Sequence, residues 1–295
     1  MSEPHAHMQM WSLSLVITGV LALTALIYLR GWFCLRKAFP DLIAGWRLAA
    51  FISGLFLVWI AGASPLTALD HRSLTIHMMK HLLLMTLAAP LLLAGAPAFP
   101  LVCGFPRLFI KSDHPLAIRS AHWLDHARMY PVLCWLAGTT VVIAWHLPAV
   151  FQLGMRSPWV HSLEDGTFLL AGLLFWWPII TAPPSLTGTT STRWSMALYL
   201  FLATLPCDVL SAFLVFCGRS VYPGYLPAAQ LFSLSPIQDQ ECAGALMWVW
   251  VTFAYLIPAF IITVQLLSPQ TAYASAPARA TPAARSLHSS EAEVL

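Results

Sequence analysis

The stretch "SLTIHMMKHLLLMTLAAPLLLAGAP", residues 73–97, decides the fold class of this chain. It is apolar enough to cross, as a helix, the roughly 30 Å of hydrocarbon in a bilayer. Its first half nevertheless carries His77, Lys80 and His81. Ionisable side chains are expensive in hydrocarbon, and those that occur there are functional candidates by default. The stretch therefore predicts a membrane span that contains part of a functional site.

The composition of the whole chain also indicates a membrane protein. Of its 295 residues, 59% are hydrophobic and 9% are charged, against about 25% charged in soluble domains. Apolar runs long enough to span a membrane occur at residues 11–29, 48–69, 73–94, 129–148, 166–182, 194–217 and 245–267. We therefore expect an all-α, polytopic membrane protein with a seven-helix transmembrane bundle, in contact with membrane lipid and without a nucleic-acid partner.

The positions of lysine and arginine predict the orientation of this bundle, because these residues concentrate in short cytoplasmic loops. With the N-terminus outside and the C-terminus cytoplasmic, the cytoplasmic segments hold 11 of the 15 Lys and Arg residues and the outer loops hold three. We expect a multi-pass protein of the bacterial plasma (inner) membrane. Its expected parts are an outer His/Met tail at 1–10, the transmembrane domain at 11–267 and a disordered cytoplasmic tail at 268–295. Segment 97–131 is expected to hold a helix on the inner surface.

In this topology, the polar residues within the spans or at their ends fall in the outer half of the bilayer. They are His77, Lys80 and His81 in span three, His146 at the end of span four, His161, Glu164 and Asp165 at the start of span five, Asp208 in span six, and Asp239 and Glu241 at the start of span seven. Their convergence predicts a site on the outer side.

The spacing and chemistry of the histidines predict a transition-metal site. His77 and His81 are four residues apart, so both rings lie on one face of a helix. Imidazoles from three helices, with carboxylates to hold the second ring nitrogens, suit copper or zinc. The predicted ligands, lining one cavity, are His77, His81, His146 and His161. The residues expected to form ion pairs or to orient the ligands are Lys80, Glu164, Asp165, Asp208 and Asp239.

Other interpretations of these residues stay open. An interfacial histidine with a water partner would explain His146 or His161 taken singly. Haem ligation would also explain the pair of His77 and His81. The methionines within residues 78–85 are more often packing groups than ligands.

Further groups that bind soft metal ions are expected on the outer side of the bundle. A soft ligand set of imidazole and thioether, suited to cuprous copper, is present in "HAHMQM" as His5, His7, Met8 and Met10. A disordered tail without a metal role is the alternative. Cys217 and Cys242 fall near the outer ends of successive spans, where they could pair or bind metal.

The order of several motifs resembles one known family. The motifs are "HMMKHLLLMTLAAPLLLAGAP", "WHLP", "HSLEDGTFLLAGLLFWWPII", "YLFLATLPCDVLSAFLVF", "VYPGY" and "DQECAGALMW". Together they are similar to the membrane-integral CtaG family of cytochrome c oxidase assembly factors, over residues 45–267. The resemblance implies seven spans, no enzymatic activity, cytochrome c oxidase subunits as partners, and the supply or insertion of copper into a haem-copper oxidase at the outer side.

The resemblance also bears on single residues. The family's polar positions are matched by His77, His81, His146, His161 and Glu164. The family usually has Gln where Lys80 stands and His where Asp165 stands, so this chain replaces a neutral pair by a charged one.

Two other functions compete with oxidase assembly. A haem-binding membrane oxidoreductase component would use the same histidines as axial ligands. A copper transporter would need a polar path across the inner half of the bilayer, which the sequence lacks. A retinal pump is excluded because span seven has no lysine for a Schiff base.

Lys80 raises a separate question, because it lies about 12 Å along the helix from Arg72. Its side chain can extend outward to water, or its ammonium group can form an ion pair inside the bundle. Because Asp165 would also be costly without a partner, we predict a Lys80–Asp165 ion pair, or failing that a Lys80–Glu164 pair.

Overall fold

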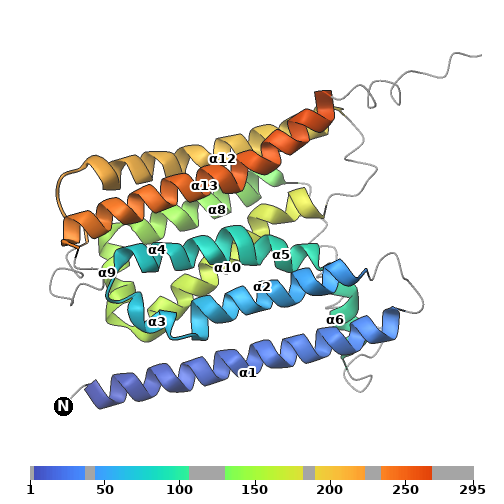
Figure 1. Ribbon diagram of the computed structural model, residues 1–295, viewed down its shortest axis with the longest axis horizontal. Helices are drawn as coiled ribbons and strands as arrows, with labels where there is room; N and C mark the ends of the chain where they lie inside the picture. The colour runs from blue at the N-terminus through green and yellow to red at the C-terminus, as the bar shows by residue number, and fades with distance from the viewer. Residues whose placement is uncertain (1–2, 37–43, 106–129, 182–189, 223–233, 268–295) are drawn as a thin grey trace, which may run out of the picture.

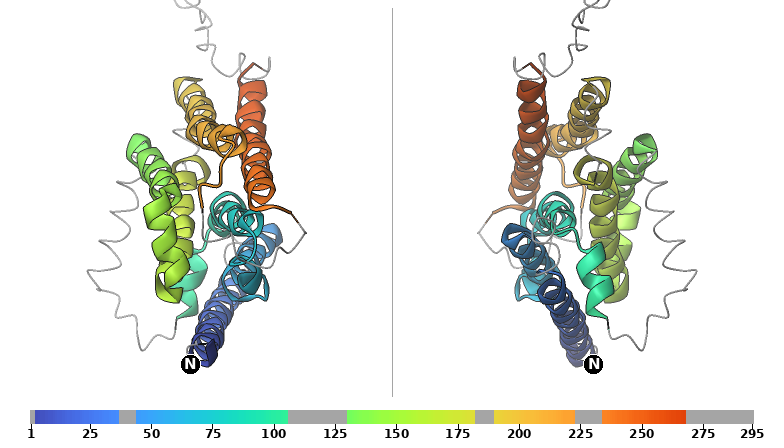
Figure 2. Two further views of the ribbon diagram at one scale, coloured as in Figure 1. Left: turned by 90° about the vertical axis from the view of Figure 1, so that its left-hand side faces the viewer. Right: turned by 90° about the vertical axis from the view of Figure 1, so that its right-hand side faces the viewer.

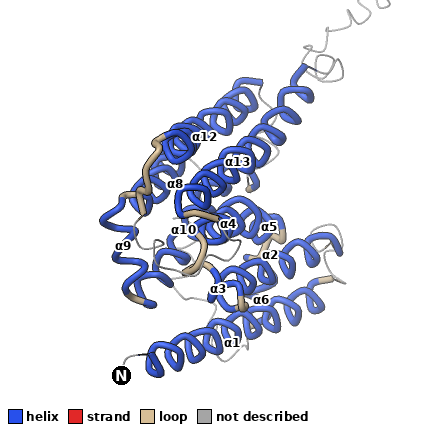
Figure 3. Tube along the Cα trace, turned by 60° about the vertical axis from the view of Figure 1, so that its left-hand side comes forward, coloured by secondary structure: helices blue, strands red, loops and turns tan. Residues whose placement is uncertain are grey.

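The computed structural model describes residues 3–36, 44–105, 130–181, 190–222 and 234–267, and every regular element in these ranges is a helix (Figure 3). Five helices are long and single: α1 (Glu3–Leu35), α2 (Gly45–Ala63), α10 (Pro158–Ile180), α12 (Thr190–Phe216) and α13 (Pro236–Leu267). The shorter elements are α3 (Leu66–Leu69), α4 (Leu74–Leu82), η1 (Leu83–Ala88), α5 (Ala89–Ala94), α6 (Ala98–Gly104), α8 (Pro131–His146) and α9 (Pro148–Arg156).

The described helices confirm a multi-pass membrane protein. Six of them are long and apolar enough to span a membrane, counting α4, η1 and α5 as one, and the bent pair α8 and α9 raises the number to seven. Span five begins at Pro158 and span seven at Pro236, about eight residues before the expected starts at 166 and 245. Hydropathy alone ends a span at its charges, whereas here the helices continue because these charges find partners inside the bundle.

Three of the segments expected from the sequence lie partly or wholly outside the described residues. Helix α1 begins at Glu3, so the expected tail 1–10 forms its first turns from that residue onward. Helix α6 opens the expected inner-surface segment, but residues 106–129 lie outside the described ranges, as does the expected tail 268–295. The orientation of the termini across the membrane stays a prediction.

The third span is the central rod of the bundle. End-on, the rod of α4, η1 and α5 lies between α1 and α2 on one side and α12 and α13 on the other (Figure 2). Its middle part, η1, is a π-helix. This wider helical turn is rare in proteins overall, and where it occurs it is often at a functional site. Trp176 Nε1 of α10 donates to the Met85 carbonyl at 3.1 Å, and Trp250 Nε1 of α13 donates to Thr86 Oγ1 at 2.8 Å. Two neighbouring helices thus hold the π turn in place.

The fourth span is broken at its histidine. Helix α8 has 16 residues, about 24 Å of rise, which is less than the bilayer core. Leu147 is extended (φ −66°, ψ 126°) because Pro148 follows it. Helix α9 then leaves α8 at 75°. His146 is consequently the last residue of α8 and lies at the bend.

The start of α4 is capped by a carboxylate from the other end of the chain. Asp239, in the first turn of α13, accepts hydrogen bonds from the backbone N–H groups of Leu74 (2.6 Å) and Thr75 (3.2 Å). It also accepts from the hydroxyls of Ser73 (2.9 Å) and Thr75 (2.7 Å). The first N–H groups of a helix have no partner within the helix, so Asp239 satisfies them and fixes where His77 and His81 lie.

We predict that Asp239→Ala destabilises the bundle by about 2 kcal/mol, because an Asp cap contributes up to this amount and the donors it leaves are buried. Thermal unfolding in detergent measures the change. Glu241→Ala is the matched control, since the half-buried Glu241 takes no part in this cap. Equal unfolding temperatures for the two variants would contradict the capping role.

Candidate metal centre

The bundle gathers its polar residues at one end. The left of Figure 1 shows this end of the bundle. It contains the N-terminus of α1, the short helices α3 and α9, the last turns of α12 and the first turns of α13. The same end carries the start of α4 with its two histidines and the start of α10 with Glu164 (Figure 1). The alternation of span directions expected from the sequence therefore brings these residues together.

His77, His81 and Glu164 form a compact buried group. His77 Nε2 lies 3.4 Å and His81 Nε2 lies 3.6 Å from the same atom, Glu164 Oε1. One ligand atom from each residue lies within 4.8 Å of the others. Donors on a tetrahedral ion with bonds of about 2.0 Å are about 3.3 Å apart. The group therefore has the donor set and the approximate spacing of a three-ligand metal site.

The two imidazoles of this group lie within ion-pair distance of carboxylates, with His81 Nε2 also 3.5 Å from Asp165 Oδ1, but they form no hydrogen bonds in the described ranges. None of the four ring nitrogens of His77 and His81 has a hydrogen-bond partner within the part of the chain that the structure describes. Buried polar atoms are normally paired, and a nitrogen lone pair is what a metal ion takes up. Phe168 stacks on His81 with the ring centroids 4.0 Å apart. Gly154 of α9 leaves room for the carboxylate, since a Cβ there would lie 2.9 Å from Glu164 Oε2.

Lys80 is fully buried and has three partners. Its Nζ lies 2.5 Å from Asp70 Oδ2, 3.1 Å from Asp165 Oδ1 and 2.6 Å from His161 Nε2. An ammonium has three donors and no acceptor, and two carboxylates and one imidazole surround it here. The pair expected between Lys80 and Asp165 is therefore present, and Lys80 does not extend outward to water.

Asp70 is the participant that sequence reasoning missed. Hydropathy ended span two at Leu69 and left Asp70 in an exposed loop, whereas the single turn of α3 folds the chain back and buries Asp70 completely. Burial alone would raise the pKa of this carboxyl, but the contact with His161 and the charge of Lys80 lower it below its usual range. An acidic residue in a tight turn ten positions before a buried lysine is the signal that could have found it.

The structure divides the four predicted ligands among three places. His77 and His81 share Glu164. His161 Nε2 lies 2.6 Å from Lys80 Nζ and 2.9 Å from Asp70 Oδ2, and its Nδ1 lies 3.4 Å from Glu164 Oε2. The expectation that all four line one site is therefore replaced by a smaller group, in which His161 orients the carboxylate.

His161 also belongs to a second group of possible ligands. Its other members are Asp70 and the half-exposed His71, with one ligand atom from each residue within 4.8 Å of the others. Lys80 already lies against both Asp70 Oδ2 and His161 Nε2. The ammonium thus lies where a metal ion would need to bind in this second group, so the first group is the better candidate for a metal site.

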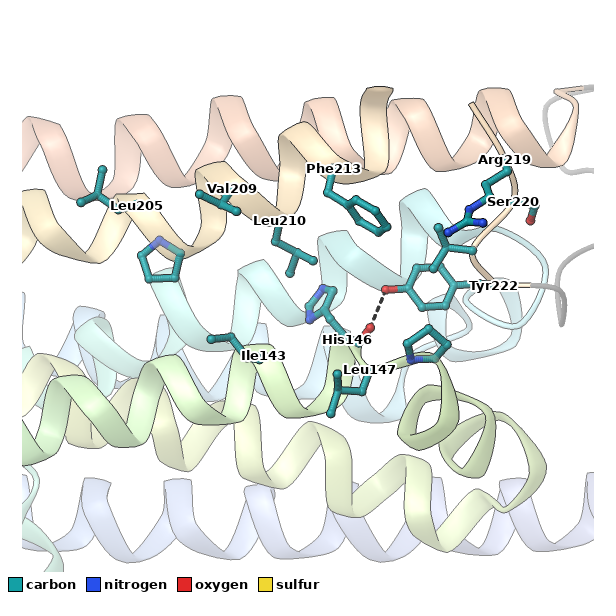
Figure 4. A pocket seen from close by; sticks show the side chains of 13 residues that line it. Ile143, His146, Leu147, Leu205, Val209, Leu210, Phe213, Arg219, Ser220 and Tyr222 are labelled. Atoms are coloured by element: carbon teal, nitrogen blue, oxygen red, sulfur yellow. Dashed lines mark hydrogen bonds between the residues drawn. The ribbon is translucent and has the colours of Figure 1, made fainter. Parts of the chain in front are cut away.

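His146 lies outside both groups. Its Nε2 is 3.2 Å from Met78 Sδ, and its Nδ1 is 2.7 Å from the Val142 carbonyl oxygen. A groove of about 900 Å³ runs beside it between α8 and α12 (Figure 4). Tyr222 at one end of this groove donates from its hydroxyl to the His146 carbonyl at 2.9 Å (Figure 4).

The remaining predicted residues have other roles. Asp239 is the cap of α4 rather than a member of an ion pair. Asp208 lies on α12, outside both groups, and its Oδ1 has no hydrogen-bond partner among the described residues. Cys217 and Cys242 are free thiols, and Gln240 Nε2 donates to Cys217 Sγ at 3.2 Å. The side chains of His5, His7, Met8 and Met10 are not among those the structure describes.

The charges around the group favour a cation. Asp70, Glu164 and Asp165 supply three carboxylates, and Lys80 is their ammonium. With neutral imidazoles the buried cluster has an excess of two negative charges. Burying charge without compensation is costly, so the cluster is balanced by protonated imidazoles or by a bound cation.

We predict that Lys80→Met destabilises the protein by about 3–5 kcal/mol, because it leaves two buried carboxylates without their cation. Asp165→Asn is expected to cost less, since Lys80 keeps Asp70. Thermal unfolding in detergent compares both with the exposed control Arg156→Gln. Exchanging the charges of Lys80 and Asp165 is expected to fail as a rescue, because a carboxylate at position 80 would face Asp70; restored stability would contradict this network.

Comparison with known proteins gives the family. Residues 26–268 match the family described as "Cytochrome c oxidase caa3 assembly factor (Caa3_CtaG)". Uncharacterised proteins of Mycobacterium bovis and Mycobacterium tuberculosis are each 24% identical over 247 residues, which cover 81% of this chain and 36% of theirs. One of Mycobacterium leprae is 22% identical over 269 residues, which cover 88% of this chain and 39% of its own.

The matched region thus spans 36–39% of the length of these relatives. No solved structure matches the chain. The family match covers all the described helices from α2 to α13, including α4 and α10, which carry the buried histidines and Glu164. The chain belongs to the cytochrome c oxidase caa3 assembly factor family.

Proposed function

We propose that this protein assists the maturation of a haem-copper cytochrome c oxidase by binding copper as cargo at His77, His81 and Glu164. The observation that carries the proposal is the buried group itself, with four ring nitrogens that have no hydrogen-bond partner within the described ranges. Membership of an oxidase assembly family supplies the recipient. The protein acts as a binding and delivery factor rather than as an enzyme, and oxidase subunits are its partners.

The chemistry of the group supports copper as the cargo. Two imidazoles and a carboxylate are a donor set that binds copper or zinc. The excess of negative charge around Glu164 attracts a cation, and Lys80 does not oppose it because Asp70 and Asp165 neutralise its charge. With the N-terminus outside, the group lies in the outer half of the membrane, where the copper centres of such an oxidase are loaded.

The alternative of haem binding is disfavoured by two observations. His77 and His81 approach the same carboxylate oxygen from one helix face, so they cannot take the opposite axial positions of one haem. The cavity beside His81 has a volume of about 20 Å³, whereas pockets for organic ligands have roughly 300–1,000 Å³. An ion fits this space and a macrocycle does not.

We predict that His77→Ala, His81→Ala and Glu164→Gln each reduce copper binding at least about tenfold, because each removes one of three ligands. Elemental analysis of the purified protein measures the bound metal, and the copper content and activity of the oxidase from the same cells measure delivery. His71→Ala is the matched control, a histidine at the same end that is outside the group.

The outcomes separate the alternatives. Loss of metal in the control alone would move the site to Asp70, His71 and His161. A fully copper-loaded oxidase in cells with the His77→Ala variant would contradict the proposed function. A haem absorption band in the purified wild-type protein would favour the haem-binding alternative.

A further inference from the structure

The small cavity beside His81, next to the His77–His81–Glu164 group, is lined by sulfur. It has a volume of about 20 Å³ and lies among α4, η1, α8, α10, α12 and α13. Its sulfur-bearing side chains, each at most 8% exposed, are Met78, Met85, Cys207 and Met247. Two imidazoles, His81 and His146, complete its polar lining apart from hydroxyl groups. Thioethers, a thiol and imidazoles are the ligands that select monovalent copper.

The hydrogen bonds of His146 show that one of its atoms lacks a suitable partner. Nδ1 lies 2.7 Å from the Val142 carbonyl oxygen, which can only accept, so Nδ1 carries the proton. In the neutral ring, Nε2 is then a lone pair. Its neighbour at 3.2 Å is Met78 Sδ, which also presents lone pairs. A buried nitrogen and a buried sulfur therefore face each other without a hydrogen between them.

A soft cation resolves this mismatch. Nitrogen and sulfur ligands at about 2.0 and 2.3 Å from one ion, at a tetrahedral angle, are about 3.5 Å apart, close to the 3.2 Å between His146 Nε2 and Met78 Sδ. A cavity of about 20 Å³ holds one water-sized group. It can take an ion stripped of water but not a hydrated hard cation such as magnesium, which gives up its waters reluctantly.

We propose that Met78 and His146 form a site for monovalent copper that is separate from the His77–His81–Glu164 group. Met85, Met247 and Cys207 line the same cavity and are available as further soft ligands. The inference deepens the proposed function and rests on it, because copper is the soft cation that an oxidase assembly factor would carry.

The proposed Met78–His146 site has two neighbours, the groove between α8 and α12 and the His77–His81–Glu164 group. His146 also lines the groove between α8 and α12, where its ring lies beside Leu210 and Ile143 (Figure 4). His81 lines the cavity and is at the same time a member of the His77–His81–Glu164 group. An ion bound at Met78 and His146 is therefore one side chain away from the groove and one side chain away from the second group.

The test uses the full chain purified in detergent under reducing, anaerobic conditions. Cu⁺ is titrated against a chromogenic chelator, and Ag⁺ serves as a redox-inert probe. Met78→Leu conserves volume and removes the sulfur, while Met79→Leu is the matched control one residue along the same helix. We expect Met78→Leu and His146→Ala to weaken binding of the first Cu⁺ or Ag⁺ equivalent at least 100-fold. Met79→Leu, whose half-buried side chain lies outside the cavity, is expected to leave it unchanged.

A second measurement guards against a folding defect. Met78→Leu is expected to retain the Zn²⁺ binding that His77→Ala loses, which shows that the bundle is intact. X-ray absorption of the Cu⁺-loaded wild type is expected to show sulfur at about 2.3 Å, and this signal should weaken in Met78→Leu. Unchanged Cu⁺ affinity in Met78→Leu, or a Cu⁺ site with nitrogen and oxygen neighbours only, would overturn the inference.

The two proposals fail in different ways. Reduced oxidase copper with His77→Ala, together with wild-type Cu⁺ binding by Met78→Leu, would leave the proposed function intact and reject the soft site. Weakened Cu⁺ binding by Met78→Leu, together with normal oxidase copper in cells with the His77→Ala variant, would keep the soft site and reject the delivery role assigned to the first group.

Discussion

The rest of the site depends on the burial of one ammonium group. Lys80 cannot reach water, and a charge in a membrane bundle is tolerated only where partners satisfy it. Asp70 from the turn after α3, and Asp165 and His161 from α10, supply those partners. These contacts tie the turn after α3, helix α4 and helix α10 together at one end of the bundle. They also neutralise the charge that would otherwise repel a cation from His77 and His81.

The same requirement explains the other polar contacts of the bundle. The start of α4 is buried, so its N–H groups are paired with Asp239 from α13. The π turn in the same rod is held by indole N–H groups from α10 and α13. Each contact joins the third span to a distant helix. The span with the histidines is thus anchored by polar contacts to both α10 and α13.

The histidines differ in the side chains that they contact. His77 and His81 face a carboxylate and form a group of nitrogen and oxygen donors. His146, at the break before Pro148, faces a thioether instead. The break matters because it ends α8 at this ring and turns α9 toward Glu164. Two donor sets of different softness therefore lie next to each other, with His81 in contact with both.

The sequence by itself determined the membrane fold, the approximate spans, the pairing of His77 with His81 and the ion pair of Lys80 with Asp165. These follow from composition, helix period and the cost of unpaired charge, which are local or pairwise properties. Only the tertiary structure decided that Asp70 joins Lys80, that Asp239 caps α4 and that His146 lies against Met78. These contacts depend on how a single turn folds back, where a helix breaks and which faces pack together, and these are properties of the packed bundle.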